Sequence, residues 1–241
     1  MEDGGYLFVC GDTHGTLDSK KIERLKLRYP LTYNDYIIIC GDAGIVWDKD
    51  TIRDTINYYE NFGTNILFVD GNHENFDLLN SYKVEMFNGG KVHKISEHIF
   101  HLMRGQVYTI LGKTILTMGG ASSHDKNSRQ PHISWWEDEE ITYADLIEAN
   151  ENLQRYNNAV DYVISHTQPS KVLDELVENL TVCGESVPYF LQPKLNKTQS
   201  NLQLDELDNT IKYKMWFSGH LHIDEHLSNH IILYEDIIKI N

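Results

Sequence analysis

Five short motifs in this sequence place aspartate, asparagine and histidine directly after apolar runs. Such side chains pack poorly in a core, but their carboxylate and amide oxygens and imidazole nitrogens are good ligands for hard or borderline divalent cations. Residues two apart in extended chain face the same side, so an Asp-x-His or His-x-His pair can grip one ion. The motifs together predict a site for two divalent ions. In chain order they are Asp12-x-His14, Asp42, Asn72-His73, His166 and His220-x-His222.

The third motif is part of the run Asp70-Gly71-Asn72-His73-Glu74, which follows the apolar residues 65–69. Alone it could be a turn before a capped helix. Its place at the carboxyl end of a predicted strand favours a site, because open α/β sheets bind ligands there. We expect Glu74 in the first turn of the next helix, where a carboxylate interacts favourably with the helix dipole.

The elements that position these motifs alternate in a regular way over the first eighty residues. Apolar runs at 6–10, 36–40 and 65–69 predict strands, and each is followed by a polar turn and a helical pattern. Asp18 and Asp50 are the expected N-caps of the first two helices. This alternation predicts parallel strands joined by right-handed crossovers.

From residue 83 onward the pattern is one of short apolar pieces, which predicts antiparallel strands and a second sheet. Gly112-Lys113 lies between the runs 107–111 and 114–118 and predicts a hairpin turn. Residues 142–157 have the apolar spacing of a helix, and 160–164 and 215–217 are strands that lead into His166 and His220. The remaining strands are expected at 84–87, 92–95, 99–103, 231–233 and 237–240.

Length and composition limit the class of protein. The 241 residues favour one domain, and 36 acidic against 21 basic residues give a net charge of −15. That charge leaves no broad cationic surface for nucleic acid. Cys10, Cys40 and Cys183 do not form a disulfide framework. No run resembles a signal peptide or reaches the length of a membrane span, so we expect a cytoplasmic protein without a membrane partner.

The ordered motifs resemble those of the calcineurin-like metallophosphoesterase superfamily, which are Asp-x-His, Gly-Asp, Gly-Asn-His-(Asp/Glu), a lone His and Gly-His-x-His. The resemblance extends from Asp12 to His222. It implies an α/β fold of four αββα layers, a β-sandwich flanked by helices, in one metallophosphoesterase domain over residues 1–241. The run from Gly119 to Asp125, with Arg129 and the pair Trp135-Trp136 downstream, also resembles an insert of a bacterial and phage subgroup.

The resemblance implies a role for each motif. The ligands of one ion would be Asp12, His14, Asp42 and His222, and those of the other Asp42, Asn72, His166 and His220, with Asp42 bridging. His73 would be the catalytic imidazole, which donates a proton to the leaving oxygen or stabilises charge there. Nitrogen and oxygen ligands without thiolate suit manganese first, and iron or zinc as alternatives. The implied reaction is hydrolysis of a phosphate monoester or diester by a metal-bridging hydroxide.

Two positions differ from the branch that contains phosphoprotein phosphatases and diadenosine tetraphosphatases. That branch has arginine before Gly-Asn-His, and Val-Asp-Arg-Gly after the second Gly-Asp. Here Asp70 and the residues 43–46 occupy these places, so the phosphate-binding arginines are missing. The aspartate that partners the catalytic histidine is replaced by Ile45, and Asp48 is the expected substitute.

Two segments are expected on the substrate side: residues 119–141, here called the insert, and residues 170–212, here called the cap segment, with helical pieces around 172–180 and 202–213. In the insert, Arg129 is expected to contact phosphate, because guanidinium binds phosphate through two nitrogens. His124 is expected to contact substrate, with a solvated loop as the alternative. Asn72 and His73 complete the expected substrate-binding residues. The tryptophan pair is expected in the core of the insert, and the acidic residues 137–140 at a solvated helix start.

The substrate could be a phosphorylated small molecule or a phosphorylated protein. Two other functions stay open. One is a metal-binding interaction scaffold without catalysis, and the other is a nuclease or cyclic-nucleotide phosphodiesterase. His73 beside a complete ligand set favours the enzyme, and the net charge disfavours nucleic acid. The other histidines are expected on ordinary polar strand faces: His93, His98, His101, His226 and His230.

Overall fold

The three apolar runs near the N-terminus form parallel strands in the computed structural model, which describes residues 4–241. They lie at the centre of a seven-stranded sheet, sheet A, whose outer strands pair antiparallel. The predicted parallel arrangement of these strands is therefore confirmed. In spatial order sheet A contains β13 (Ile237–Lys239), β1 (Leu7–Cys10), β2 (Tyr36–Ile39), β3 (Asn65–Phe68), β6 (Ile99–Leu102), β5 (Gly90–Lys94) and β4 (Val84–Phe87).

A second sheet, sheet B, is formed by the short apolar pieces of the middle and the end of the chain. Its central strands β8, β9, β10 and β12 are parallel, and β7 and β11 are its antiparallel edges. In spatial order it contains β11 (Glu225–Leu227), β12 (His230–Ile232), β10 (Met215–Ser218), β9 (Tyr162–Ser165), β8 (Lys113–Met118) and β7 (Gln106–Ile110).

The hairpin between β7 and β8 is present, but its turn is one residue earlier than predicted. Leu111 and Gly112 form the turn, both with positive φ, and Lys113 pairs with Ile110. Two central residues with positive φ define the turn type whose twist matches that of a hairpin. Gly112 correctly indicated the turn, but the other central residue of the turn is Leu111 and not Lys113.

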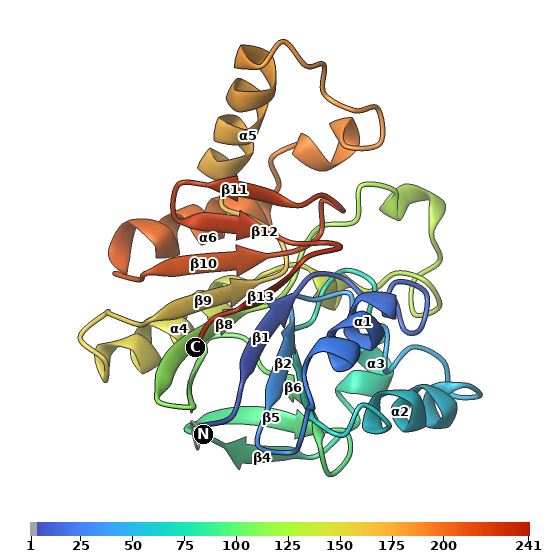
Figure 1. Cartoon of the computed structure of the whole chain (residues 1–241). Coiled ribbons are helices and arrows are strands. Elements are labelled where there is room, and N and C mark those ends of the chain that lie inside the picture. The colour runs from blue at the N-terminus through green and yellow to red at the C-terminus, as the bar shows by residue number, and fades with distance from the viewer. Residues whose placement is uncertain (1–3) are drawn as a thin grey trace.

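The two sheets pack face to face, and helices cover both outer faces (Figure 1). Helices α1 and α2 cover sheet A, and α4 and α6 cover sheet B. This is the expected four-layer αββα arrangement of the α/β class, and the fold prediction is confirmed. The helices are α1 (Lys20–Arg28), α2 (Ile52–Glu60), α3 (Phe76–Leu79), α4 (Tyr143–Gln154), α5 (Ser170–Val182) and α6 (Gln199–Thr210). None of the helices in residues 4–241 combines the length and apolarity that crossing a lipid bilayer requires.

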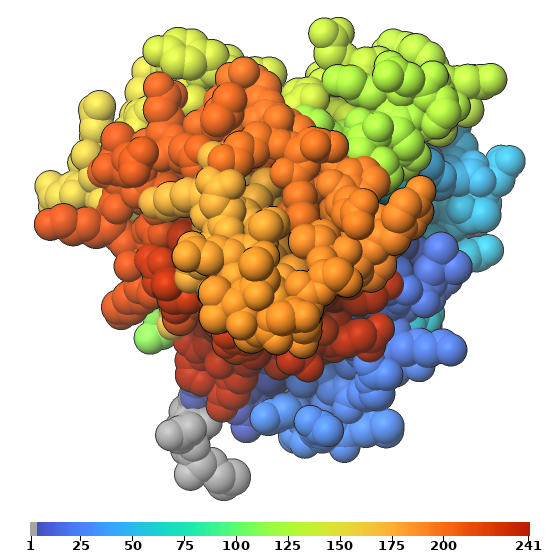
Figure 2. All heavy atoms as spheres, turned by 90° about the horizontal axis from the view of Figure 1, so that it is seen from above, coloured from blue at the N-terminus to red at the C-terminus, as the bar shows by residue number. Residues whose placement is uncertain are grey.

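The cap segment and the insert lie on the same face of the sandwich. Figure 2 shows them side by side, the first part of the cap segment in orange and the insert in yellow-green. Helix α5 packs through Val172, Leu173 and Leu176 against Leu227 and Ile232 of sheet B. The insert contains two short 3₁₀ helices, η1 (Lys126–Ser128) and η2 (Glu137–Glu139), and the cap segment a third, η3 (Gln192–Leu195).

Candidate metal centre

All five motifs lie at the carboxyl ends of strands, and both sheets contribute to one rim. Asp12, Asp42 and Asn72 follow β1, β2 and β3 of sheet A, while His166 and His220 follow β9 and β10 of sheet B. The buried apolar strands fix the direction in which each following turn begins. Residues from the two ends of the chain therefore come within contact distance.

A first group of ligand-type atoms belongs to Asp12, His14, Asp42 and His222, and these atoms all lie within 4.8 Å of one another. Asp12 Oδ2 is 3.1 Å from His222 Nε2, and Asp42 Oδ2 is 3.4 Å from His14 Nε2. The resemblance to calcineurin-like metallophosphoesterases implied that these four residues bind one ion. Their placement supports that grouping, and the ligand roles stay a prediction.

A second group lies on the other side of the Asp42 carboxylate. Asp42 Oδ1 is 3.3 Å from His166 Nε2, which is also 3.2 Å from Asn72 Oδ1. The His220 ring centroid is 5.0 Å from that of His166. The two oxygens of Asp42 thus face different groups, an arrangement that allows the carboxylate to bridge two ions.

The backbone is bent sharply at the ligand-type residues. His14, Asp42, His220 and His222 have φ values of 43°, 47°, 69° and 56°. This left-handed backbone conformation costs a non-glycine residue on the order of 1–3 kcal/mol. Residues held in it cluster at functional sites. Gly219 serves close approach, because a Cβ there would lie 2.2 Å from Asp12 Oδ1.

The electrostatics suit cations. Burial would raise the pKa of Asp12, but His166 and His222 outweigh it and lower that pKa. Burial would lower the pKa of His14, but the Asp42 carboxylate outweighs it and raises the pKa to about 9. Asp12 Oδ2 is buried, and its contact with His222 Nε2 lacks hydrogen-bond geometry. Two buried carboxylates and several imidazoles form a donor set that fits divalent ions, which would replace the protons on these rings.

His73 lies at the edge of this rim and is held through its backbone, since its N–H donates to Asp42 Oδ1 at 2.6 Å. The Arg129 guanidinium meets its ring, with terminal nitrogens 3.2 and 3.3 Å from the two ring nitrogens. Burial lowers the pKa of His73. The Asp42 carboxylate raises that pKa and the Arg129 charge lowers it, and the net shift is downward. The prediction that Asp48 partners the His73 ring was wrong. Its carboxylate is exposed and accepts a hydrogen bond from the Asp50 N–H instead.

Arg129 therefore reaches the site, and Asp125 orients it through a 2.7 Å bond to Nε. Its role in phosphate binding stays a prediction. Ser123 connects the insert to the second ligand group, because its Oγ lies 3.2 Å from Asn72 Nδ2. His124 is exposed and lines a cavity beside His220, so its contact with substrate also stays a prediction.

Glu74 does not act at the helix N-terminus, and that expectation was wrong. Asn75 caps α3, while the buried Glu74 carboxylate accepts the N–H of Ala43 at 2.7 Å. Burial together with the nearby Asp42 raises its pKa well above the usual range. Glu74 thus holds the loop that follows β2. Asp18 likewise does not cap α1, because Ser19 occupies the N-cap position and the Asp18 carboxylate lies 2.7 Å from His14 Nδ1.

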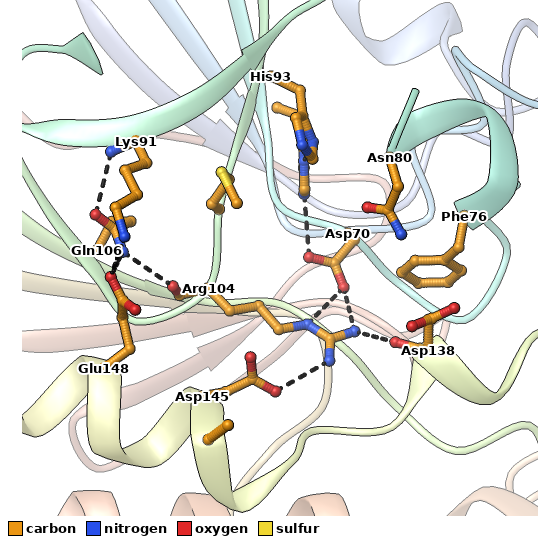
Figure 3. A pocket seen from close by; sticks show the side chains of 13 residues that line it. Asp70, Phe76, Asn80, Lys91, His93, Arg104, Gln106, Asp138, Asp145 and Glu148 are labelled. Carbon is orange, nitrogen blue, oxygen red and sulfur yellow. Dashed lines mark hydrogen bonds and ion pairs between the residues drawn. The ribbon is translucent and has the colours of Figure 1, made fainter. Parts of the chain in front are cut away.

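Asp70 forms a buried network behind the site (Figure 3). One carboxylate oxygen accepts from Arg104 Nε and Nη2 at 2.8 and 2.5 Å, and the other lies 3.1 Å from His101 Nε2. The opposing charge of Arg104 outweighs burial and lowers the pKa of Asp70. His101 in turn contacts His93 at 3.0 Å. His93, His101 and His230 are buried, so their assignment to ordinary polar faces was wrong.

Arg104 also fixes the end of the insert, and sequence reasoning missed it. Its guanidinium donates to the carbonyl oxygens of Asp138, Glu139 and Glu140. Glu139 is fully buried and accepts from the Ser123 N–H at 2.6 Å, so the acidic run is not simply solvated. A single arginine directly after an apolar strand was the available indication. The expectation that the tryptophan pair forms the insert's own core was wrong: Trp135 is half-buried, and the buried Trp136 packs against Trp47 and donates its indole N–H to Asp77, both outside the insert.

Comparison with known proteins agrees with these observations. The family model described as calcineurin-like phosphoesterase matches residues 6–224. No curated protein matches the chain. Among solved structures, the sulfate thiohydrolase SoxB of Thermus thermophilus in complex with glycerol matches with 13% identity and a TM-score of 0.42. That match covers 97% of this chain and 52% of SoxB, so the chain spans about half the length of that structure.

Proposed function

The chain belongs to the calcineurin-like phosphoesterase family, and from this premise we propose that it hydrolyses a phosphate ester at a binuclear metal centre. The observation that carries the proposal is the position of Asp42. Its two carboxylate oxygens face two separate sets of nitrogen and oxygen donors. When bound, two divalent ions lower the pKa of a water between them and withdraw charge from the phosphate oxygens.

The residues of this chain have distinct tasks in the proposed reaction. Asp42 would hold both ions through its carboxylate, and its Oδ1 also fixes the His73 backbone. His73 is the proton donor to the leaving oxygen, because no other imidazole beside the two groups is left without a ligand role. The negative charge of a bound phosphate favours the protonated imidazole. Arg129 braces the His73 ring and supplies positive charge toward the ester.

Manganese is the proposed metal, with iron or zinc as alternatives, since the donors are nitrogen and oxygen without thiolate. The test is elemental analysis after metal loading and desalting, combined with turnover of p-nitrophenyl phosphate and of its bis-p-nitrophenyl diester. We expect two ions per chain and metal-dependent release of p-nitrophenol. A stoichiometry of one ion would contradict the bridging role of Asp42. Two ions without turnover of either ester would favour the scaffold.

A further inference from the structure

A cavity of about 420 Å³ opens beside the second ligand group, between the insert and the cap segment. His220 and Ser123 line it, and Ser123 Oγ contacts Asn72. The two segments that enclose it are the neighbours visible in Figure 2. A phosphate bound on the second group would therefore lie at the mouth of this cavity.

Lys194 provides a cation at that mouth. Its ammonium donates to the backbone carbonyl of His220, and no carboxylate of residues 4–241 lies within 4.0 Å of it. Every ammonium carries three donors, so two stay available for a ligand. A partly buried cation without an anionic partner is costly unless it pairs with a bound anion.

Packing holds Lys194 in this position. Its 3₁₀ helix is anchored by the neighbouring Leu191 and Leu195, which pack with Leu173 and Leu221. Leu221 lies between His220 and His222, so the same apolar cluster positions the ammonium and the histidine turn. Such anchoring reduces the entropy lost when a side chain binds its ligand.

The lining of the cavity indicates the kind of group that it takes. Hydroxyl and amide side chains dominate, among them Ser122, Thr167, Asn196, Thr198 and Gln199. The only aromatic rings among the lining residues are the imidazoles of His124 and His220, and His220 belongs to the second ligand group. The volume is in the range of small-ligand sites. A nucleobase stacks best on the large faces of phenylalanine, tyrosine or tryptophan, and none of these lines the cavity. A hydroxyl-rich group can instead exchange hydrogen bonds with the hydroxyl and amide side chains of the wall.

We propose that this cavity binds the organic group of the substrate, that the substrate is a polyol or sugar phosphate, and that Lys194 contacts its phosphate. The proposal rests on the proposed function and specifies its substrate class. Lys194 would also supply a cation from the cap segment. The phosphoprotein phosphatase branch has an arginine before Gly-Asn-His for this purpose, and this chain has Asp70 there.

The first arm tests Lys194 by binding of inorganic phosphate to the metal-loaded protein, measured by calorimetry. Lys194→Met should weaken binding on the order of 10–100-fold, the worth of one charge-assisted hydrogen bond. Lys194→Arg should recover most of the loss. The matched control is Lys197→Met in the same segment, whose ammonium is exposed and pairs with Asp174 at 2.6 Å. It should stay within about twofold of the natural protein.

The second arm compares kcat/KM for glycerol phosphate, glucose 6-phosphate and adenosine monophosphate. We expect the first two to exceed the nucleotide at least tenfold, and Gln199→Trp, which narrows the cavity, to raise KM for glucose 6-phosphate more than for glycerol phosphate. A preference for the nucleotide overturns the substrate class and leaves the proposed function standing. Equal phosphate binding by Lys194→Met and Lys197→Met overturns the role of Lys194. Absence of turnover of all three compounds by a protein that hydrolyses p-nitrophenyl phosphate overturns the substrate class alone. Absence of turnover of the p-nitrophenyl esters as well contradicts the proposed function, and phosphate binding still decides Lys194.

Discussion

Replacing Arg104 with methionine should destabilise the protein more than any surface ion-pair change. Methionine keeps much of the apolar stem, but it leaves the buried Asp70 carboxylate with His101 as its remaining partner. It also removes the donors to three backbone carbonyls at the end of the insert. The perturbation therefore leaves one buried charge and several acceptors without their donor, beside a cavity of about 270 Å³.

The expected size follows from these contacts. Removing one partner of a buried ion pair destabilises by about 3–5 kcal/mol, since the other charge stays buried. For a chain of this length each kcal/mol lowers Tm by about 2–4 °C, so Arg104→Met should lower Tm by roughly 6–20 °C. Asp70→Asn in the same chain should recover part of the loss, because it neutralises the stranded charge.

The assay is urea unfolding followed by tryptophan fluorescence. Arg24→Met is the matched control, because Arg24 pairs with Glu235 at 2.6 Å on an exposed surface. That change should alter the free energy of unfolding by at most about 1 kcal/mol. If Arg104→Met unfolds at the same urea concentration as Arg24→Met, the network does not stabilise the fold and our account of Asp70 is wrong.

Three further predictions concern the site and its surroundings. His73→Gln should keep both ions but lose turnover on the order of 10²–10⁴-fold, with the smaller loss on p-nitrophenyl phosphate, whose leaving group needs little protonation; loss of a metal ion by elemental analysis would instead make His73 a ligand. Asp42→Asn should lower both metal content and turnover more than His222→Asn, since it removes charge that two ions share, and the opposite order would contradict the bridge. Burial and the neighbouring His101 lower the pKa of His93 to about 4, so the unfolded chain takes up a proton below about pH 6.5 that folded His93 does not. The free energy of unfolding should therefore fall between pH 7 and pH 5. In urea unfolding at both pH values, the fall for His93→Asn should be smaller than that of the natural protein by up to about 2 kcal/mol. Equal falls in the two proteins would refute the lowered pKa of His93.

Local patterns were enough to predict the strands and the motifs. The buried runs ending at Cys10, Ile39 and Phe68 are apolar throughout, and each polar turn follows directly in the sequence. The site could be assembled in advance because parallel strands bring their carboxyl ends to one edge. Where only neighbours in the chain decide the structure, composition and spacing are sufficient.

The wrong predictions concern side chains whose partners are distant in the sequence. Glu74 bonds to the loop after β2, and His101 and Arg104 bond to Asp70. A charged residue beside an expected helix start or strand looks solvated until its tertiary partner is known. Glu139 shows the same problem, because its donor Ser123 lies at the other end of the insert.

The shared rim has a mechanical consequence. Asp12 belongs to sheet A and His222 to sheet B, and the Asp42–His166 contact also joins the two sheets. Ions bound there would act as cross-links between the halves of the sandwich, and at a concentration 100 times its Kd each ion would add about 2.7 kcal/mol to the free energy of unfolding. The rim would then be the last part to separate, so opening of the sheets would begin at the opposite end, near the β7–β8 turn. In hydrogen exchange, a chelator should accelerate the amides after β1 and β10 far more than those around Leu111.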